Sequence, residues 1–304
     1  PAGQQVIIAR FSQKGGPLPK LTLKLQSPLI NSVSQQDQDL VLRGRAPTRV
    51  RWYGVDDAVT DENRVTYDLE KARHFAARVR VTRTDGQLTV REGEITVEGA
   101  HEIELMVSAA TDARGADCAA IAGQDIDIAA GVSPADIWRA HVKEHQRLFH
   151  RVNLEFAGDK FAATNSSERL IASSKSAFDA DLLALMYHYG RYLMICSSRP
   201  GTMAINLSGI WSERVDPAWW SNYTLNMNVQ MCYWPAASTR LLECAEPLYD
   251  LIEALSKPGA ETARVMYGAR GWVANHQTDY LMQTTPVGHL DHAGKRCSSM
   301  RPRH

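Results

Sequence analysis

The sequence has few cysteines, and nothing in their spacing pairs them. There are five in 304 residues, an odd number, and no two stand at the short separation typical of disulfide frameworks or zinc sites. They are Cys118, Cys196, Cys232, Cys244 and Cys297. We therefore expect buried free thiols, and neither a disulfide framework nor a metal or other cofactor.

The chain also lacks an excess of charge and a long apolar run. Lys plus Arg and Asp plus Glu are both 34, so the formal net charge is zero. This balance gives no reason to expect nucleic acid or an anionic membrane as a partner, whereas a neutral glycan needs no charge bias. No segment approaches the roughly 18 apolar residues of a membrane span. The start at Pro1 shows no signal-peptide pattern, so the compartment is left open.

Residues 1–110 are predicted to form an antiparallel β-sandwich, with some N-terminal strands missing. Short alternating apolar runs are separated by Gly and Asp-Gly turns, which is the pattern of antiparallel sheets. The runs include 21–25, 39–43, 75–81, 88–90, 95–97 and 103–107.

Residues 111–165 are predicted to be a linker that contains a helix. Its first part, 111–132, is rich in Ala, Gly and Asp. A helix is expected from Ser133, since Ser133 can cap it and Pro134 suits its first position.

Residues 166–288 have helical character, with apolar residues along one broad stripe from Phe178 to Ile195. Strands first and helices afterwards favour two separate domains. Residues 289–304 are basic, with little apolar periodicity, and are predicted to be a disordered tail. A nucleic-acid-binding tail is the less favoured interpretation because the segment is short.

The segment from Gly190 to Asp279 concentrates Trp and Asn. Five of the seven Trp fall inside it: Trp211, Trp219, Trp220, Trp234 and Trp272. Indole rings suit the apolar faces of sugars, but they equally pack protein cores. Core packing is favoured for any single Trp, and the cluster beside Asn and His favours a polar pocket.

Asn226 and Asn228 are two residues apart. In a strand or extended loop their side chains would face the same way and converge on one water or hydroxyl. Turn or capping asparagines are the more ordinary interpretation. An amide can orient a water, but a carboxylate must accept its proton.

Several motifs together resemble glycoside hydrolase family 95, the α-L-fucosidases and related α-L-galactosidases. The matching pieces are Ser197–Thr202 (SSRPGT), Asn206–Trp211 (NLSGIW), Tyr223–Asn228 (YTLNMN), Tyr233–Pro235 (YWP), and Gly271–Ala274 with His276, Thr278 and Asp279. The similarity extends more weakly upstream and covers about residues 20–288. It is far more specific than any one short motif.

The resemblance implies a β-sandwich, a helical linker and an (α/α)6 six-hairpin barrel, of which residues 166–288 would be the first part. It also implies an inverting hydrolase that removes terminal α-L-fucose from glycans, with water positioned by Asn226 and Asn228. The general-acid Glu and an assisting Asp would lie beyond the matched region. We therefore expect a chain truncated at both ends and inactive by itself, from a full-length protein for which a periplasmic or extracellular location is compatible.

The resemblance also implies which side chains contact the substrate. These are Thr224, Trp211, Asn206, Trp234, His276 and Asp279. His276 and Asp279 would share a face if they lay on a helix, but two ligands are too few for a metal. Barrel packing is the equal alternative for this pair.

Three positions depart from the family pattern. Cys232 and Ser212 stand where relatives usually carry Asn, and Thr224 stands where the family varies between His and Thr. A small side chain at Thr224 leaves room for the 6-hydroxyl of L-galactose, so we expect α-L-galactosides to be tolerated by the intact enzyme.

Two other functions compete with this one. The first is a non-catalytic carbohydrate-binding fragment or pseudoenzyme, and the second is an inverting phosphorylase, which would need a phosphate site that no basic or Gly-rich loop supplies. In either barrel enzyme each hairpin buries its apolar stripe against its neighbours. A partial barrel is therefore expected to leave apolar helix faces open.

Overall fold

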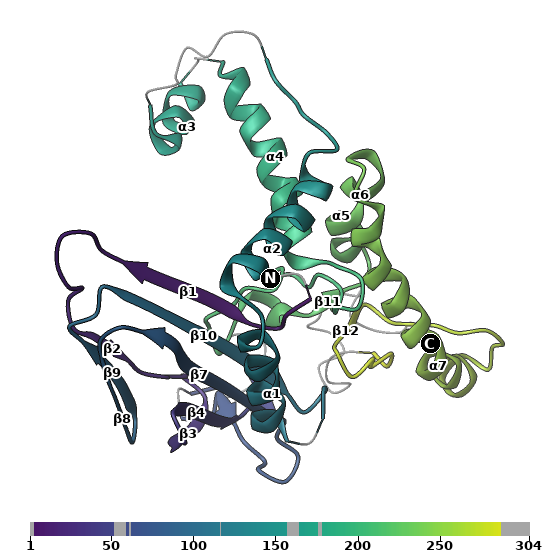
Figure 1. Cartoon of the computed structure of the whole chain (residues 1–304). Helices are drawn as coiled ribbons and strands as arrows, with labels where there is room; N and C mark the ends of the chain where they lie inside the picture. The colour runs from purple at the N-terminus through teal and green to yellow at the C-terminus, as the bar shows by residue number, and fades with distance from the viewer. Residues whose placement is uncertain are drawn as a thin grey trace. The chain divides into compact units, whose positions relative to one another are not determined.

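The computed structural model describes residues 3–51, 59–60, 62–115, 117–156, 164–175 and 178–286. The chain forms two compact units, Pro1–Glu144 and His145–His304, and Figure 1 shows that β1 to β10 belong to the first and α3 to α7 to the second. The predicted tail 289–304 lies outside the described residues. The predicted domain boundaries at 110, 165 and 288 stay predictions.

A five-stranded antiparallel sheet forms the centre of the first unit, in the order β1-β10-β7-β4-β3. Its strands are β1 (Ile7–Ser12), β10 (Glu102–Thr111), β7 (His74–Thr84), β4 (Asp39–Arg45) and β3 (Ile30–Gln36). Leu40 and Leu42 of β4 pair with Val79 and Ala77 of β7, so apolar residues of neighbouring strands stand opposite one another. The predicted runs 39–43, 75–81 and 103–107 are confirmed as strands.

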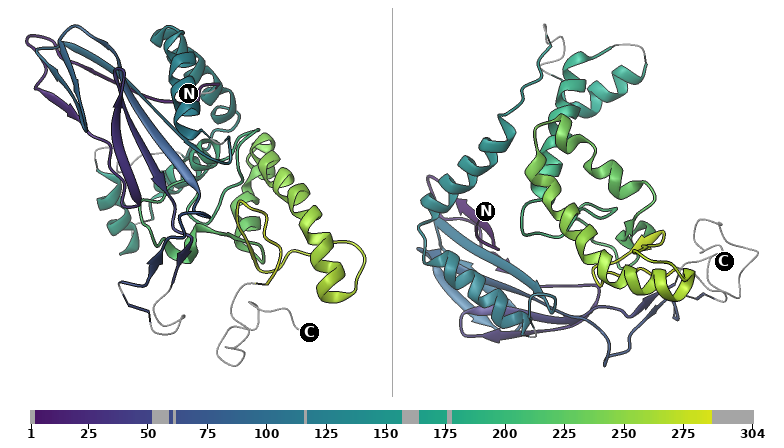
Figure 2. Two further views of the ribbon diagram at one scale, coloured as in Figure 1. Left: turned by 90° about the horizontal axis from the view of Figure 1, so that it is seen from below. Right: turned by 90° about the vertical axis from the view of Figure 1, so that its right-hand side faces the viewer.

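A smaller sheet covers one face of the first. It has the order β2-β9-β8, with β2 (Leu21–Leu23), β9 (Glu94–Glu98) and β8 (Gln87–Arg91). Ile95 and Val97 of β9 pack with Leu40 and Val79 of the large sheet in one buried cluster. Two short strands, β5 (Arg49–Val50) and β6 (Val65–Thr66), pair separately. The layered arrangement, seen from two sides in Figure 2, is that of antiparallel sheets packed face to face.

Helix α1 (Cys118–Ala130) covers the other face of the large sheet. It lies in the segment predicted as a linker, because an Ala-rich stretch with interspersed Asp lacks the strong apolar stripe that marks a helix. Asp117 caps it by accepting a hydrogen bond from the backbone N–H of Ala120. Gly123 in its middle lets the Arg78 side chain approach, since a Cβ there would stand 2.5 Å from Arg78 Nη1 and displace it.

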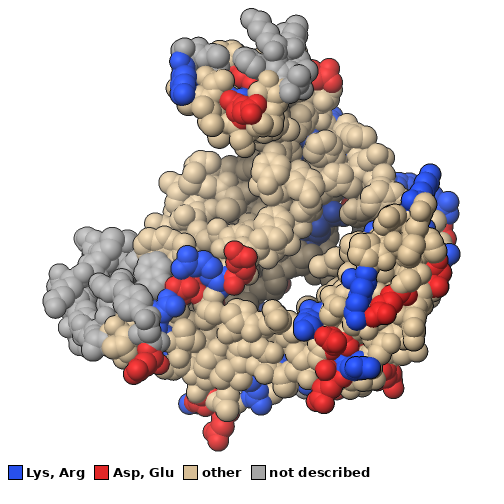
Figure 3. Space-filling model, turned by 90° about the vertical axis from the view of Figure 1, so that its left-hand side faces the viewer, with Lys and Arg blue, Asp and Glu red and all other residues tan. Residues whose placement is uncertain are grey.

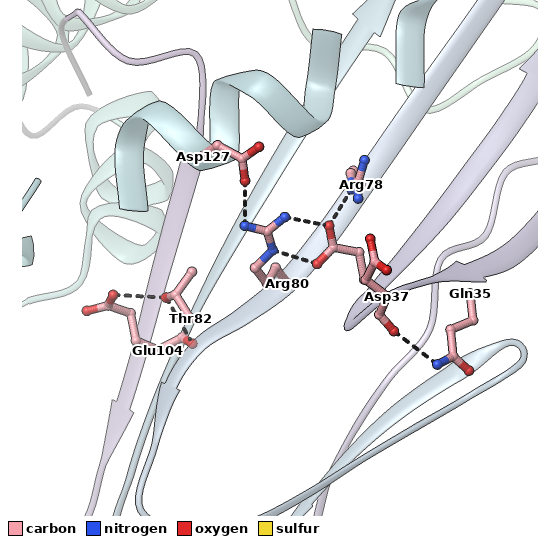
Figure 4. A network of polar contacts seen from close by, with 8 residues as sticks. Gln35, Asp37, Arg78, Arg80, Thr82, Glu104 and Asp127 are labelled. Carbon is pink, nitrogen blue, oxygen red and sulfur yellow. Dashed lines mark hydrogen bonds and ion pairs between the residues drawn. The ribbon is translucent and has the colours of Figure 1, made fainter. Parts of the chain in front are cut away.

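A buried ion network joins α1 to the sheet (Figure 4). Asp39 is enclosed and accepts from Arg78 Nε, and its two oxygens accept from Arg80 Nε at 2.6 Å and Nη2 at 2.9 Å. Arg80 Nη1 also donates to Asp127 of α1 at 2.7 Å. The hydrogen bond to Asp39 raises the pKa of Arg80 above its usual range. Asp39 thus contacts two arginines on one face of the sheet, and Asp127 supplies the second negative charge of the network.

Replacing Asp39 by Ala is expected to lower the free energy of unfolding by about 3–5 kcal/mol, because two guanidinium groups lose their buried carboxylate. Chemical denaturation followed by circular dichroism measures the change. The matched control is Lys20→Ala, at the exposed ion pair with Glu98, which should cost under about 1 kcal/mol. Equal effects of the two substitutions would contradict the role given to Asp39.

Helix α2 (Pro134–Phe149) begins where it was predicted, with the Ser133 Oγ accepting from the backbone N–H of Asp136 at 3.1 Å. The second unit contains further helices: α3 (Ser166–Ser174), α4 (Ala180–Ser197), α5 (Asn228–Tyr233), α6 (Pro235–Ser238) and α7 (Glu246–Tyr267), with the 3-10 turns η1 (Ala218–Ser221) and η2 (Leu242–Ala245). Helix α7 ends at Gly268, which adopts the left-handed conformation at φ 58°.

Arg191 of α4 holds the centre of the second unit together. Its side chain is buried and ends among backbone carbonyls. Nη1 donates to the carbonyls of Phe149 at 2.7 Å and Val152 at 3.2 Å, and Nη2 donates to that of Leu148 at 3.0 Å. Leu148 and Phe149 are the last two residues of α2, and Val152 follows it in the chain, so Arg191 supplies donors where helical hydrogen bonding ends. Burial lowers the pKa of Arg191, and its guanidinium N–H groups are hydrogen-bonded to carbonyl dipoles rather than to a carboxylate.

The core of the second unit lies between α4, α5 and α7, with Ile195, Val229, Tyr233, Leu251 and Leu255 in one buried cluster. Other faces of these helices are apolar and exposed. The exposed large apolar side chains of α4 are Leu183, Leu185, Met186, Tyr189 and Tyr192, and those of α7 are Tyr249, Ile252, Val265 and Tyr267. That these faces belong to a partial barrel stays a prediction. Strands followed by helices are confirmed, while the (α/α)6 barrel stays a prediction.

On the face drawn in Figure 3, Lys and Arg lie among Asp and Glu rather than in a patch of one sign. No helix among the described residues has the length and hydropathy needed to cross a membrane. Within those same residues, no three His, Cys, Asp or Glu come together as a metal site would require.

Candidate functional site

A short two-stranded sheet organises the segment that carries the sequence motifs. Strand β11 (Tyr223–Thr224) pairs antiparallel with β12 (Gln277–Thr278), which places Tyr223 opposite Thr278 and Thr224 opposite Gln277. The backbone N–H of Leu225 extends the ladder by donating to the His276 carbonyl at 2.8 Å. Figure 1 shows the two strands side by side. Segments more than fifty residues apart in sequence thereby form one local structure.

Two buried tyrosines attach the preceding loop to the core. Tyr233 OH accepts from the backbone N–H of Ile205 at 2.9 Å and lies 2.8 Å from Ser198 Oγ. Because Ser198 Oγ donates to the Cys244 carbonyl at 2.7 Å, the proton between the two hydroxyls comes from Tyr233. Tyr223 OH donates to the Ala204 carbonyl at 3.0 Å, and burial raises its pKa to about 12. These bonds fix the chain immediately before Asn206.

A pocket of about 460 Å³ opens beside the β11–β12 pair. It is lined by Asn206, Trp220, Ser221, Asn222, Tyr223, Gln277, Thr278, Asp279, Tyr280 and Gln283. Its volume is within the range of small-molecule sites, which run from roughly 300 to 1,000 Å³. The lining combines aromatic rings, amides, a hydroxyl and one carboxylate.

Backbone strain marks the aromatic wall of this pocket. Trp220 and Ser221, which line it, have φ of 55° and 49°, and the preceding Trp219 has φ of 53°. Left-handed conformations of non-glycine residues cost about 1–3 kcal/mol each, and they gather at functional sites. The strained turn is held by the hydrogen bond of 2.9 Å from the Trp220 N–H to the Pro217 carbonyl, and by Ser221 Oγ at 2.6 Å from Ser208 Oγ.

Of the predicted substrate-binding residues, Asn206 and Asp279 line the pocket. Thr224 does not line the pocket itself, but its Oγ1 donates a hydrogen bond of 2.7 Å to Oδ1 of Asn222, which does. Trp211, Trp234 and His276 do not line it. His276 and Asp279 flank strand β12 rather than sharing a helix face, so the conditional helical arrangement considered for them does not occur.

Asn226 and Asn228 occupy two different local structures. Asn226 follows β11, whereas Asn228 is the first residue of α5, and Met227 between them has φ −159° and ψ −43°. Both asparagines are exposed, and within the described residues no hydrogen bond joins their side chains. Their role in holding a water stays a prediction.

The five tryptophans of the segment are not core residues. Each exposes 36% or more of its surface, from 36% for Trp220 to 62% for Trp234. The interpretation that was favoured for a single Trp, burial in a core, therefore does not hold here. Trp220 is the one that lines the pocket.

Sequence reasoning missed Gln277 and Asn222, because neither belonged to a residue type that marks catalysis. The structure brings them together through the β11–β12 pairing. Gln277 exposes 5% of its surface, and its Nε2 is enclosed without a hydrogen-bond partner among the described residues. His276 Nδ1 is likewise enclosed without a hydrogen-bond partner among the described residues. A buried polar group without a partner typically costs about 1–3 kcal/mol.

Glu243 of η2 is a structural carboxylate. Its oxygens accept from Arg151 Nη2 at 2.6 Å and Nη1 at 2.8 Å, and from Arg147 Nη1 at 3.2 Å. The hydrogen bonds from Arg151 lower the pKa of Glu243 to about 2. A carboxyl group that stays ionised at neutral pH cannot donate a proton to a leaving group, so Glu243 is no candidate for a general acid.

Glu243→Gln is expected to lower the melting temperature at pH 7 and to converge with the unmodified chain in acid. The depressed pKa contributes stability that is fully present above the ordinary value of 4.5 and is lost as pH falls through about 2. Melting temperatures measured by circular dichroism between pH 7 and pH 2 check this. Exposed Glu253→Gln is the control, and a Glu243→Gln difference that persists unchanged at pH 2 would refute the assignment.

Known proteins match both units. Residues 133–299 match the catalytic domain of glycosyl hydrolase family 95, and residues 1–116 match the N-terminal domain of glycosyl hydrolase family 65. The chain is 32% identical over 300 residues to alpha-L-fucosidase 2 of Arabidopsis thaliana, a match that covers 93% of this chain and 35% of that protein.

Fungal proteins match shorter segments. A probable alpha-fucosidase A of Aspergillus niger is 37% identical over 147 residues, or 48% of this chain and 18% of that protein. Its counterpart in Aspergillus oryzae is 31% identical over 183 residues, or 58% of this chain and 25% of that protein. The chain thus spans about a third, or less, of the length of each curated relative it matches.

Proposed function

Because this chain belongs to glycosyl hydrolase family 95, we propose that it is part of an inverting glycosidase that removes terminal α-L-fucose from glycans. The match of residues 133–299 to the catalytic domain of that family carries the proposal. The chemical character of the pocket supports it, because amides, a carboxylate and aromatic rings suit a neutral sugar.

In the proposed reaction a carboxylic acid protonates the leaving oxygen while a water attacks the opposite face of the sugar. Asn226 and Asn228 hold that water. An amide carbonyl orients a water but cannot take its proton, so the reaction also needs a carboxylate base. The general acid and the assisting carboxylate are proposed to lie in the part of the relatives' length that this chain does not span.

A non-catalytic role as a glycan-binding fragment or pseudoenzyme is the second candidate. The observation that favours it is that Asn226 and Asn228 lie in two different local structures, with no hydrogen bond between their side chains among the described residues. The two proposals predict different behaviour of the same purified chain toward the same glycan.

The decisive assay incubates the chain with an α-1,2-fucosylated oligosaccharide and measures released fucose. We expect no release from the chain itself, and release from a chimera that continues this chain beyond residue 286 with the C-terminal part of the Arabidopsis relative. In the chimera, Asn226→Ala and Asn228→Ala are each expected to lower kcat by about 10²-fold or more, because the attacking water loses its orientation.

Asn153→Ala, at an exposed position, is the matched control and should leave kcat unchanged. Release of fucose by the chain alone would show that the catalytic acid lies within these residues. A chimera that is folded but inactive would favour the binding fragment.

Thr224 is proposed to set tolerance for L-galactose, which carries a hydroxyl at C6 where L-fucose has a methyl hydrogen. The Thr224→His chimera is expected to lower the ratio of kcat/KM for α-L-galactoside over α-L-fucoside by roughly tenfold or more, since a larger side chain fills that space. Thr202→His in the preceding loop is the control. An unchanged ratio, or a strong fucoside preference of the unsubstituted chimera, would remove Thr224 from this role.

A further inference from the structure

The pocket beside β11 and β12 has an unusual distribution of hydrogen-bonding atoms. Asn206 Oδ1 accepts from the Ser208 N–H at 2.8 Å, and Asn222 Oδ1 accepts from Thr224 Oγ1 at 2.7 Å. Both amide oxygens are therefore occupied within the protein. Among the described residues the two amide nitrogens have no partner, so each remains a donor.

Asp279 supplies the complementary acceptor. Its Oδ1 accepts from the backbone N–H groups of Leu281 at 2.8 Å and Gln283 at 3.4 Å, which fixes the carboxylate at the pocket. Its Oδ2 has no partner in the part of the chain that the structure describes. Donors and one charged acceptor thus line the same cavity.

Gln277 is the most enclosed polar side chain of the lining that lacks a partner. It exposes 5% of its surface, and its Nε2 is unpartnered within the described residues. A protein that buries a carboxamide and leaves its donor unmatched gains the missing hydrogen bond when a ligand or water fills the cavity.

The aromatic side of the pocket is formed by residues whose backbone conformations are strained. Trp220 and Ser221 both line it, and both adopt left-handed conformations. Tyr280 provides a second ring. Backbone strain at a concave site indicates that the positions of these side chains serve binding, even though the strained conformations lower the stability of the fold.

We propose that this pocket binds one pyranose ring of a neutral glycan, with the Gln277 carboxamide donating to a sugar hydroxyl and setting affinity. The kind of ligand rests on the proposed function. The lining includes no Lys or Arg and includes one carboxylate, so a uronic acid or sulfated sugar is excluded by charge. Asn206 and Asn222 donate to further hydroxyls, Asp279 accepts, and Trp220 and Tyr280 contact the apolar face of the ring.

The test measures binding rather than turnover. Isothermal titration calorimetry on the full chain uses an α-1,2-fucosylated oligosaccharide as the neutral probe and an oligosaccharide of uronic acids as the acidic probe. We expect saturable binding of the neutral probe only. Gln277→Met, which keeps the length of the side chain but removes the amide, should weaken it by about five- to tenfold.

Two further variants separate recognition from folding. Asn222→Asp preserves the acceptor for Thr224 Oγ1, removes the donor and adds a negative charge, so it should also weaken binding about fivefold or more without unfolding the pocket. Gln230→Met is the matched control, since the Gln230 side chain is exposed on α5 and does not line the pocket. In addition, Gln277→Met should raise the melting temperature of the free chain, because it removes an unmatched buried donor.

The proposal is overturned if the neutral probe does not bind, if the acidic probe binds as tightly, or if Gln277→Met and Asn222→Asp both bind like the unsubstituted chain. If the chimera hydrolyses the glycan and these substitutions change neither Kd nor KM, the proposed function stands and this pocket has no part in it. If binding depends on Gln277 but neither the chain nor the chimera hydrolyses the glycan, the pocket binds sugar and the proposed function is wrong.

Discussion

The helical unit depends on a buried guanidinium that forms no ion pair with a carboxylate among the described residues. Arg191 is 2% exposed and meets the backbone carbonyls of Leu148, Phe149 and Val152, with a longer contact of 3.4 Å to that of Thr239. One side chain therefore terminates α2 and ties it to α4 and to the end of α6. Because a charge without those dipoles would be costly to bury, the position of each helix end is set by the need to satisfy Arg191.

In the strand unit, buried arginines are satisfied by carboxylates instead of backbone carbonyls. There Asp39 provides the charge that two arginines require, and α1 adds Asp127 from above the sheet. In both units the buried cation specifies geometry more than it adds stability, since planar guanidinium groups accept few arrangements of partners. The apolar clusters supply the bulk of the stabilisation, and the arginines select which packing is adopted.

How far the sequence predicts this structure depends on whether the signal is local. Strands 39–45, 74–84 and 102–111 follow from alternation, and α2 follows from Ser133 and Pro134, because these signals lie within a few residues. Helix α1 was not anticipated, since its Ala and Asp composition carries little periodicity. The pairing of Thr224 with Gln277 spans 53 positions and only two residues per strand, so no local pattern reveals it. For the same reason Asn206 and Asp279 were proposed separately, whereas Gln277, which lines the same pocket, was not proposed.

The brevity of the β11–β12 pair affects how the pocket opens. Two residues per strand contribute few hydrogen bonds, whereas β7 and β10 share a ladder along most of their length. Because Tyr223 is part of the buried core cluster, it is β12 that can separate from β11 while the core stays intact. When it does, the wall contributed by 277–280 moves away from the wall contributed by 221–223. A ligand that contacts both walls would stabilise the paired state of the two strands. Binding to the pocket and local ordering of these strands would therefore be thermodynamically coupled.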